Sequence, residues 1–508
     1  MKKHQWYGLA TKNSILRIVS ISILFSSVIP QTTLASLLAF QGQYQSELEE
    51  LAAISNQAVY DQLLAGGCGD ADTVASANCS GTTFVVWNNV RELVHTANAL
   101  NNSGSTIFSL DSDLEGLGFA LRWTAGEEFS SEESLVDSFL SSQLSGLASR
   151  ITALRGGASG FNVAGVATDA NGNIAHLGNI KNSPQYTGMN SGDEMADVWS
   201  RLGGFLNATY TTGDQDASER EDAFDFVGVG FNAGLDYRLD DYWVVGGLLG
   251  YIAEEVDFDS GKSIVDGGVI MYGYSMIGFA LYQSDTWFYS GSIGYQLSDF
   301  ETKRSIRYPS INPDVANVDT SAESNNDAYT YSYSLATGIA LFVSDTFTLE
   351  PSFSASYQEV TIDEYREQDI HNAGFDFFID KQNIASLETA TGLKAQFTLS
   401  TRYGVFMPFA DIQFFTQHKT GGHSIRAAYV GASQTLTDDA FFNLPTNNVD
   451  ANYETYSIGM AAVVRGAAQS YSGAPASGGV QVYFNYREVH HIGDYHQKSL
   501  SGGMRYEF

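Results

Sequence analysis

The sequence is poor in proline and in positive charge. Its 508 residues include 8 Pro, and 26 Lys plus Arg stand against 58 Asp plus Glu, so the formal net charge is −32. So few cations argue against a nucleic-acid partner, because phosphate backbones are bound by Lys and Arg. They also give no electrostatic attraction to an anionic lipid surface. The scarcity of proline suits long strands, since a proline removes a donor from the ladder.

Long apolar runs are missing after the first residues. The chain opens with a basic leader that ends at Arg17, followed by a largely apolar run from Ile18 to Ile29 and by the small-residue site Thr33-Leu34-Ala35. This pattern predicts a cleavable export signal over residues 1–35, with an uncleaved anchor as the alternative. No later segment reaches the roughly 20 apolar residues of a transmembrane helix. Any further crossing of a membrane therefore has to be made by strands.

Cysteine and catalytic motifs are scarce as well. The only two cysteines, Cys68 and Cys79, lie close together, which in an exported protein predicts a disulfide that closes a small loop. Two thiols without a nearby histidine make a poor zinc site. The sequence has no Gly-x-Ser-x-Gly elbow and no His-Glu-x-x-His motif. We therefore predict no enzyme, no catalytic or metal-binding residue and no cofactor, and interpret His490, His491 and His496 as ordinary polar residues.

Apolar residues recur with helical spacing between residues 36 and 156. The clearest helix is expected from about Ser131 to Leu154, with Ser131 as its N-cap and acidic residues in its first turn, where the helix dipole favours them. Gly156-Gly157 would end it. Its second face is rich in Ser and Gln, which predicts an amphipathic helix and not one that spans lipid. Residues 158–197 are rich in Gly, Asn and Ser and resemble a linker.

From Val198 onward the period changes from helical to two. Between Val227 and Arg238, for example, large apolar residues alternate with Gly, Asn, Asp and Arg. An apolar face opposite a small or polar face is typical of a membrane barrel with a wet lumen. Aromatic residues near the ends of apolar faces, such as Trp243 and Tyr251, fit the aromatic girdles at the two membrane interfaces.

Twelve strands can be counted, and the gaps between them alternate in length. Tight turns are expected at Asp240-Asp241, Ser284-Asp285, Ser344-Asp345 and Arg402-Tyr403. Long loops are expected at 214–222, 305–327, 365–382 and 421–451, whereas the gap at 466–476 is longer than the alternation predicts. Outer-membrane barrels have short periplasmic turns and long external loops. The strands are expected at 198–212, 224–238, 242–257, 266–283, 286–304, 328–344, 346–364, 383–401, 404–420, 452–465, 477–490 and 497–508.

The C-terminus carries a more specific pattern. Ser501, Gly503, Tyr506 and Phe508 fit a polar-x-Gly-x-x-aromatic-x-aromatic signal. With the twelve strands and the helix before them, residues 198–508 resemble the autotransporter β-domain, the translocator of type V secretion. The resemblance implies that this signal is read by the barrel assembly machinery. It also implies periplasmic chaperones, outer-membrane lipid and lipopolysaccharide as partners, a monomeric barrel, and a helix, here Glu132 to Arg155, that threads the pore.

The expected fold is thus an all-β transmembrane barrel of about 12 antiparallel strands, preceded by a mainly α-helical region. We divide the chain into a signal peptide (1–35), a short helical passenger or periplasmic region (36–128), an amphipathic helix (129–157), a linker (158–197) and the barrel (198–508). The leading hypothesis is an outer-membrane protein, exported by its cleavable signal peptide and with extracellular long loops, that translocates or displays its N-terminal segment.

The alternative is a non-secreting outer-membrane channel, or a surface structural or adhesive protein, that keeps its N-terminal helices in the periplasm. The charged residues expected in the lumen bear on this choice. They are Asp236, Arg238, Glu350 and Lys394. They either set the ion preference of an open pore or form hydrogen bonds across the lumen and to the helix.

Overall fold

A computed structural model describes the chain from residue 36 to residue 507. Residues 70–72, 156–166, 169–173, 176–200, 219, 241, 259–263, 285, 402, 419–423, 433–440, 447–450, 466–479 and 493–494 are not described. The expected signal peptide, most of the linker, the gap at 466–476 and Phe508 therefore lie outside the described residues. In the linker, only the two-residue strands β1 (Ala167–Thr168) and β2 (Ile174–Ala175) are described.

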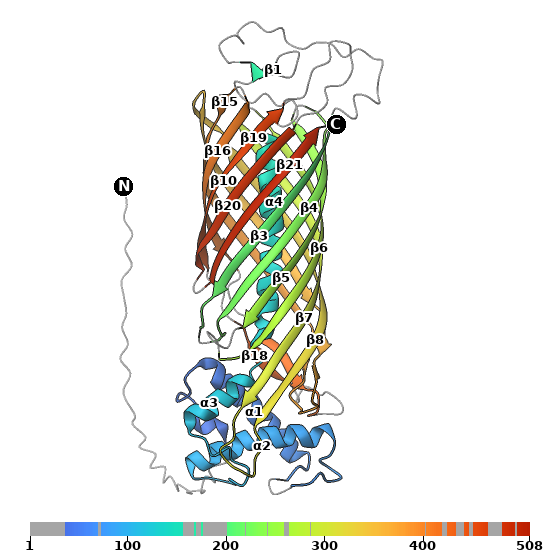
Figure 1. Ribbon diagram of the computed structural model, residues 1–508, viewed down its shortest axis with the longest axis vertical. Helices are drawn as coiled ribbons and strands as arrows, with labels where there is room; N and C mark the ends of the chain where they lie inside the picture. The colour runs from blue at the N-terminus through green and yellow to red at the C-terminus, as the bar shows by residue number, and fades with distance from the viewer. Residues whose placement is uncertain are drawn as a thin grey trace, which may run out of the picture. The chain divides into compact units, whose positions relative to one another are not determined.

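Twelve long strands form one closed antiparallel barrel (Figure 1), as the sequence predicted. Each strand pairs with its neighbour along the chain, β8 pairs with β10, and the last strand pairs with the first through Tyr495↔Gln215 to Glu507↔Gly203. Two short strands, β9 (Leu341–Ser344) and β15 (Leu399–Thr401), extend the barrel at the tight turns. The twelve are β3 (Leu202–Gln215), β4 (Phe224–Arg238), β5 (Trp243–Phe258), β6 (Gly267–Gln283), β7 (Trp287–Tyr308), β8 (Val318–Ile339), β10 (Phe347–Ile362), β14 (Gln382–Phe397), β16 (Gly404–Gln417), β19 (Asn452–Arg465), β20 (Val480–Ile492) and β21 (Tyr495–Glu507).

The alternation along the strands separates an apolar outer face from a polar lumen. In β4, Val229 and Phe231 are 42% and 56% exposed, whereas Asn232 and Asp236 are 4% and 2% exposed. Successive side chains of a strand point to opposite faces, so one set of residues faces the membrane and the other faces the lumen. The four tight turns lie where they were predicted, at 239–242, 284–286, 345–346 and 402–403.

The loop predicted at 305–327 is shorter in the structure. Strands β7 and β8 continue pairing as far as Tyr308↔Val318, so the connection is only residues 309–317. The acidic residues that suggested a loop, Asp319, Glu323 and Asp327, occupy exposed positions. The residues between them are buried, with Ile306 and Ala322 fully inaccessible. A second apolar face therefore extends the hairpin beyond the predicted strand ends.

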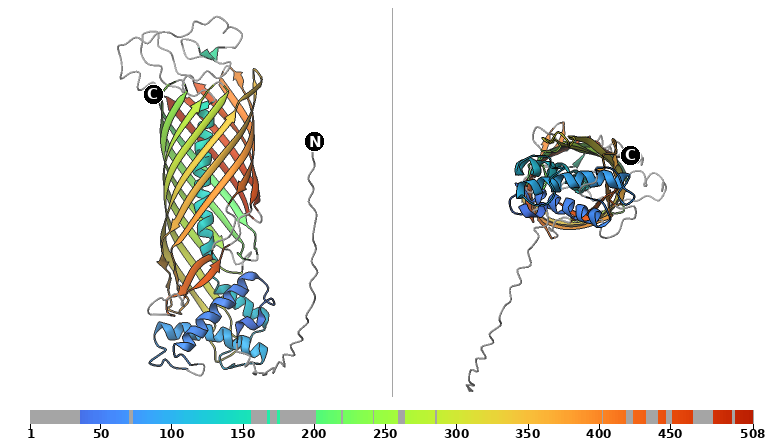
Figure 2. Two further views of the ribbon diagram at one scale, coloured as in Figure 1. Left: turned by 180° about the vertical axis from the view of Figure 1, so that it is seen from behind. Right: turned by 90° about the horizontal axis from the view of Figure 1, so that it is seen from below.

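The N-terminal region forms a small group of helices at the long-loop end of the barrel (Figure 2). It comprises η1 (Leu37–Phe40), α1 (Glu47–Ala65), α2 (Thr82–Asn101) and α3 (Leu114–Trp123). A disulfide joins Cys68 to Cys79 between α1 and α2. No helix among the described residues is long and apolar enough to span a bilayer.

The long loops contribute a second, smaller sheet at the same end of the barrel. Its strands are β11 (Tyr365–Arg366), β13 (Phe377–Ile379), β17 (Ser424–Tyr429) and β18 (Phe442–Pro445), while β12 (Gln368–Asp369) pairs with β8. Buried residues of α1, α2 and α3, such as Leu48 and Trp87, share one apolar core with Phe375, Phe377 and Tyr429 of the loops. We call the helices η1 and α1–α3 the cap, and this end of the barrel the mouth.

The fourth helix, α4 (Glu128–Arg155), runs lengthwise inside the barrel (Figure 1). The predicted N-cap at Ser131 is wrong, because the helix begins at Glu128, one residue before the predicted boundary at 129. The chain turns at Gly126, whose φ of +69° suits glycine, and the helix begins two residues later at Glu128. The Ser131 hydroxyl consequently does not cap the helix but donates a hydrogen bond of 2.8 Å to the Glu128 carbonyl.

Candidate functional site: the pore helix and the barrel mouth

The C-terminal end of α4 is fixed by a buried ionic contact in the lumen. The Arg150 guanidinium pairs with the Asp236 carboxylate of β4, and the Arg505 guanidinium of β21 lies 3.1 Å from the other Asp236 oxygen. All three side chains are 4% exposed or less. Asp236, one of the charges expected in the lumen, thus bonds to the helix. Glu350 and Lys394 bond to each other across neighbouring strands, 3.0 Å apart.

The N-terminal half of α4 is held by hydrogen bonds to strands β5, β7 and β8 and to the long-loop residue Tyr365. The Glu132 carboxylate accepts bonds from Thr302 (3.2 Å), Asn326 (3.1 Å) and Tyr365 (3.0 Å). Further along, the Ser138 hydroxyl donates to Glu254 at 2.7 Å. These contacts use the Ser- and Glu-rich face of the helix, so the amphipathic pattern serves a polar lumen on one side and apolar contacts on the other.

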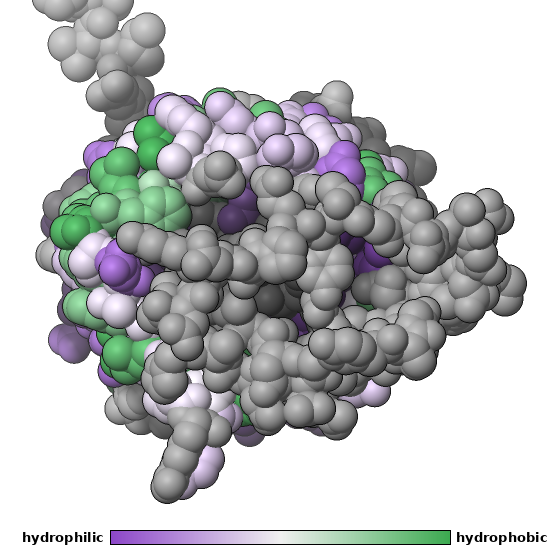
Figure 3. Space-filling model, turned by 90° about the horizontal axis from the view of Figure 1, so that it is seen from above, coloured by the Kyte–Doolittle hydropathy of each residue, from purple (hydrophilic) through white to green (hydrophobic). Residues whose placement is uncertain are grey.

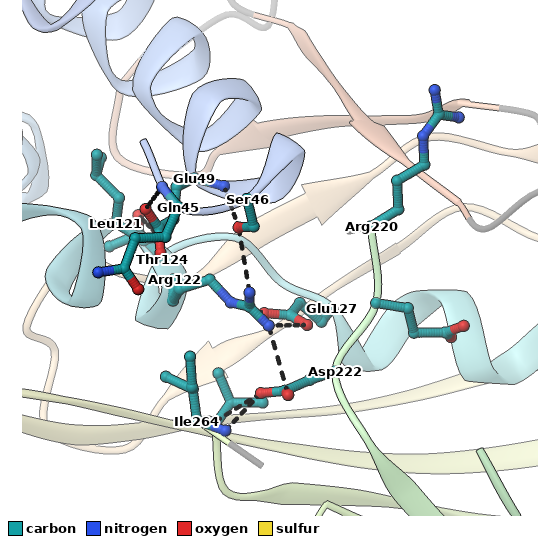
Figure 4. A network of polar contacts seen from close by, with 12 residues as sticks. Gln45, Ser46, Glu49, Leu121, Arg122, Thr124, Glu127, Arg220, Asp222 and Ile264 are labelled. Carbon is teal, nitrogen blue, oxygen red and sulfur yellow. Dashed lines mark hydrogen bonds and ion pairs between the residues drawn. The ribbon is translucent and has the colours of Figure 1, made fainter. Parts of the chain in front are cut away.

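A second network ties α4 to the cap around Arg122, at the end of α3 (Figure 4). The Arg122 guanidinium lies 3.0 Å from the Glu127 carboxylate and 3.4 Å from that of Asp222, and it donates to the Ser46 hydroxyl at 3.2 Å. Asp222 in turn accepts the backbone N–H of Ile264 at 2.6 Å. Burial raises the pKa of the Glu127 carboxyl well above its usual range, and the charge of Arg122 opposes that rise.

A third contact joins the barrel wall to the long loops. Arg304 of β7 forms a bidentate pair with Glu367, with distances of 3.1 and 2.7 Å, and both side chains are 1% exposed. The same guanidinium donates to the Phe375 carbonyl at 2.7 Å and lies over the Phe377 ring at 4.5 Å. Planar bidentate pairing is the strong form of a charge-assisted hydrogen bond, so this pair fixes the loop on the barrel rim.

Sequence reasoning missed the networks of Arg122 and Arg304. Arg122 stands between Leu121 and Trp123, and a cation in an apolar setting is rarely buried without a partner. In a chain with so few cations, the apolar neighbours of Arg122 could have predicted a buried arginine with an acidic partner. The partners Asp222 and Glu367, however, lie far away in sequence. Nothing in the spacing connects them with their arginines.

The residues predicted at the C-terminus lie on the closing strand. Ser501 is buried on the lumen side of β21, and Tyr506 is 42% exposed on the outer face. Gly503 lies between them on the strand that seals the barrel against β3. Their role as an assembly signal remains a prediction. Within the described residues, no group of three or more His, Cys, Asp or Glu side chains could hold a metal ion.

Comparisons with known proteins found one family model and several solved structures that are similar to parts of this chain. The family model for the autotransporter β-domain matches residues 204–474. The translocator domain of the autotransporter NalP from Neisseria meningitidis is 13% identical and covers 60% of this chain and 88% of that one, with a TM-score of 0.42. The β-domain of the Bordetella autotransporter BrkA is 16% identical and covers 60% of this chain and 99% of that one, with a TM-score of 0.39.

Among curated proteins, the esterase EstA of Pseudomonas aeruginosa is 22% identical over 216 residues, which are 42% of this chain and 32% of that protein. The chain therefore spans about a third of the length of this relative. The family match extends over more than half of the 508 residues and coincides with the closed barrel. The chain belongs to the autotransporter β-domain family and forms an outer-membrane translocator barrel.

Proposed function

We propose that this protein displays its own N-terminal helices on the cell surface and keeps them docked on the barrel as a cap. The course of the chain supports this. Helix α4 starts at the mouth, where Glu132 bonds to Tyr365 of a long loop, and its last turns lie beside Asp236 and Arg505 at the tight-turn end. Long loops are external in outer-membrane barrels. The segment before α4 would then be outside, and the linker after it in the periplasm.

The observation that carries the proposal is the apolar core shared by the cap and the long loops. Polar contacts strengthen this interface: Tyr429 donates to Asn56 at 3.1 Å, and Asn89 donates to the Ala373 carbonyl at 2.6 Å. An interface of this kind would be lost if the cap were released into the medium. The displayed segment is therefore a permanent part of the surface structure and not a secreted passenger.

The channel hypothesis with periplasmic helices has less support. It would place the cap at the tight-turn end, where none of its contacts with the long loops could form. The similarity to an esterase adds no activity to the proposal. The match spans a third of that protein, and the present sequence has no Gly-x-Ser-x-Gly elbow to supply a nucleophile.

The side of the membrane can be tested with single cysteines and a membrane-impermeant maleimide on intact cells. Suitable positions are Ile107→Cys in the connection between α2 and α3 of the cap, Ile311→Cys in the 309–317 loop and Tyr403→Cys in a tight turn, which are 61%, 71% and 65% exposed. We expect labelling of the first two in intact cells, and of the third only after the outer membrane is permeabilised. Labelling at position 311 together with protection at position 107 until permeabilisation would overturn the proposal.

A further inference from the structure

The outer wall of the barrel carries two rows of aromatic side chains. The row at the tight turns contains Trp243, Tyr282 and Tyr289, direct neighbours across β5, β6 and β7, and hydrophobic residues reach the outer edge of the barrel at this end (Figure 3). The second row contains Tyr251 and Tyr274, and Tyr251 follows Trp243 on β5 by eight residues. Eight residues of a strand tilted by about 40° rise about 20 Å. Because aromatic girdles mark the two membrane interfaces, the wall between the rows lies in the hydrocarbon of the bilayer.

This part of the outer wall is hollowed. A hollow of about 1100 Å³ lies over β3–β8 and the end of β21, and the described residues that line it are glycine, alanine, aliphatic, methionine and aromatic residues. Its floor contains Gly247 and Gly278, which are direct neighbours across β5 and β6. Larger side chains stand beside the floor, such as Leu249 and Met276, which are 64% and 61% exposed. The hollow is therefore a concave apolar surface that faces lipid.

The depth of the hollow matches one leaflet of the membrane. Gly247 follows Trp243 by four residues on the same face of β5, which is about 13 Å along the strand and about 10 Å in depth. One leaflet of the hydrocarbon core is about 15 Å thick. An acyl chain whose headgroup lies at the tight-turn row of aromatic residues therefore reaches the floor. Atoms that line an empty hollow lose dispersion contacts, and a flexible chain restores them by following an irregular surface.

The tight turn beside this aromatic row carries partners for a zwitterionic headgroup. The ring centroids of Trp243 and Tyr282 are 5.2 Å apart, and aromatic faces attract ammonium groups. Asp240 accepts the backbone N–H of Trp243 at 2.8 Å, so a carboxylate lies next to these rings. The Arg201 guanidinium donates to the Leu239 carbonyl at 3.0 Å, which places a group that binds phosphate at the same turn. An ammonium and a phosphate are the two charges of an ethanolamine phospholipid.

We propose that the hollow binds one acyl chain of a phospholipid with an ethanolamine headgroup, from the leaflet at the tight turns. The chain covers Gly247 and Gly278, the ammonium lies on the aromatic row beside Asp240, and the phosphate pairs with Arg201. A second copy of this chain could also fill the hollow, but it would leave the charged turn without a role. The proposal does not depend on which side of the membrane the cap occupies, so failure of the display proposal would leave it standing.

The test is native mass spectrometry of the full-length protein, delipidated in detergent and then incubated with dipalmitoyl phosphatidylethanolamine. We expect one lipid to stay bound at collision energies that remove phosphatidylglycerol with the same chains. The double variant Gly247→Leu with Gly278→Leu fills the hollow and should lose the retained lipid. A Cβ at these positions lies 3.5 and 3.9 Å from the nearest atom, so the variant should fold, which circular dichroism verifies.

The matched control is Ala410→Leu, an exposed position on β16 in the opposite wall, which should retain the lipid. Equal retention of the two lipids by the unmodified protein would overturn the proposal, as would full retention in the glycine double variant. A protein dimer that only this double variant loses would assign the hollow to a second copy and overturn it as well.

A change at the aromatic row separates the headgroup from the chain. Trp243→Leu with Trp287→Leu removes two rings that are 41% and 43% exposed. It should abolish the preference for phosphatidylethanolamine over phosphatidylglycerol, while one lipid of either kind still binds. The control Tyr403→Leu changes an exposed aromatic residue of another tight turn and should keep the preference. A preference that persists without the two tryptophans would contradict the place assigned to the ammonium.

Discussion

The mouth and the lumen hold the same helix by different means. At the mouth, α4 emerges into an apolar core that includes Phe129 and Phe377, and the ionic pair of Arg304 and Glu367 is 1% exposed. In the lumen, the helix is held by hydrogen bonds, by the Arg150–Asp236 contact, by the extension of the same core around Phe139 and by one small apolar cluster. A cavity of about 650 Å³, lined by serines as well as by apolar side chains, lies beside it. The mouth is thus built like the interior of a soluble domain, whereas the lumen contains more polar contacts and unfilled space. The cap should therefore be the main restraint on the helix.

The largest effect is expected from breaking the buried pair at the mouth. Arg304→Leu leaves Glu367 as an unpaired buried charge, which typically costs about 3–5 kcal/mol. We expect faster hydrogen exchange throughout residues 365–380, read as a lower local opening free energy. The double variant Arg304→Leu with Glu367→Leu should recover much of the loss. The control Lys303→Leu removes an exposed pair with Glu323 at 3.9 Å. It should change the local opening free energy by less than about 1 kcal/mol.

A smaller effect is expected from the corresponding change in the lumen. Arg150→Leu removes one partner of Asp236, but the Arg505 guanidinium remains 3.1 Å away. Because the carboxylate stays paired, we expect the free energy of opening to fall by about 1.5–3 kcal/mol, the usual range for a hydrogen bond to a charged group. Hydrogen exchange of the backbone amides of residues 144–155 measures this loss. Equal losses in the Arg150 and Arg304 variants would contradict the contrast between lumen and mouth.

The cap should also weaken as the pH rises. Burial raises the pKa of Glu92 in α2 from 4.5 to about 8, against the lowering influence of Arg91. The folded cap therefore holds a proton that the unfolded chain releases, so this stabilisation is complete below pH 4.5 and is lost as the pH approaches 8. We expect a loss of at least about 1 kcal/mol between pH 5 and 8, the equivalent of one pKa unit.

Hydrogen exchange of α2 at several pH values checks this expectation. Glu92→Gln should weaken the dependence of cap stability on pH and stabilise the cap at pH 8. The exposed control Glu115→Gln should leave this pH dependence unchanged. A dependence that persists in Glu92→Gln would assign the titration to another group.

The smallest effects are expected from replacing one serine by alanine at the mouth and one in the lumen. Ser130 is 7% exposed at the mouth and donates to Glu221 and to the Glu127 carbonyl, so Ser130→Ala should cost about 1–2 kcal/mol. Ser141 borders the cavity and accepts a bond of 3.4 Å from Arg487. Water can replace that contact, so Ser141→Ala should cost less than about 0.5 kcal/mol by the same measurement. Similar costs at the two positions would show that the lumen is as dry as the mouth.

Much of the architecture could be predicted from local patterns, because apolar and polar residues alternate with a period of two along a barrel strand. The strand at 224–238 was predicted with its observed ends, and the four tight turns lie at the predicted positions. The prediction failed at 305–327, where polar residues on the exposed face concealed the buried face that contains Ile306 and Ala322. That face packs against the cap, and no local pattern reveals a partner about 200 residues away.

The sequence by itself determined the class of the protein: a closed barrel with an amphipathic helix before it, because periodicity and turn composition are local properties. Only the tertiary structure decided that the cap and the long loops share one core, that Arg122 and Arg304 are buried with Asp222 and Glu367, and that α4 leans toward one wall. These features depend on contacts between segments far apart in the chain. Burial of a charge is stable only where distant elements bring a partner to it, and a sequence does not record where such elements meet.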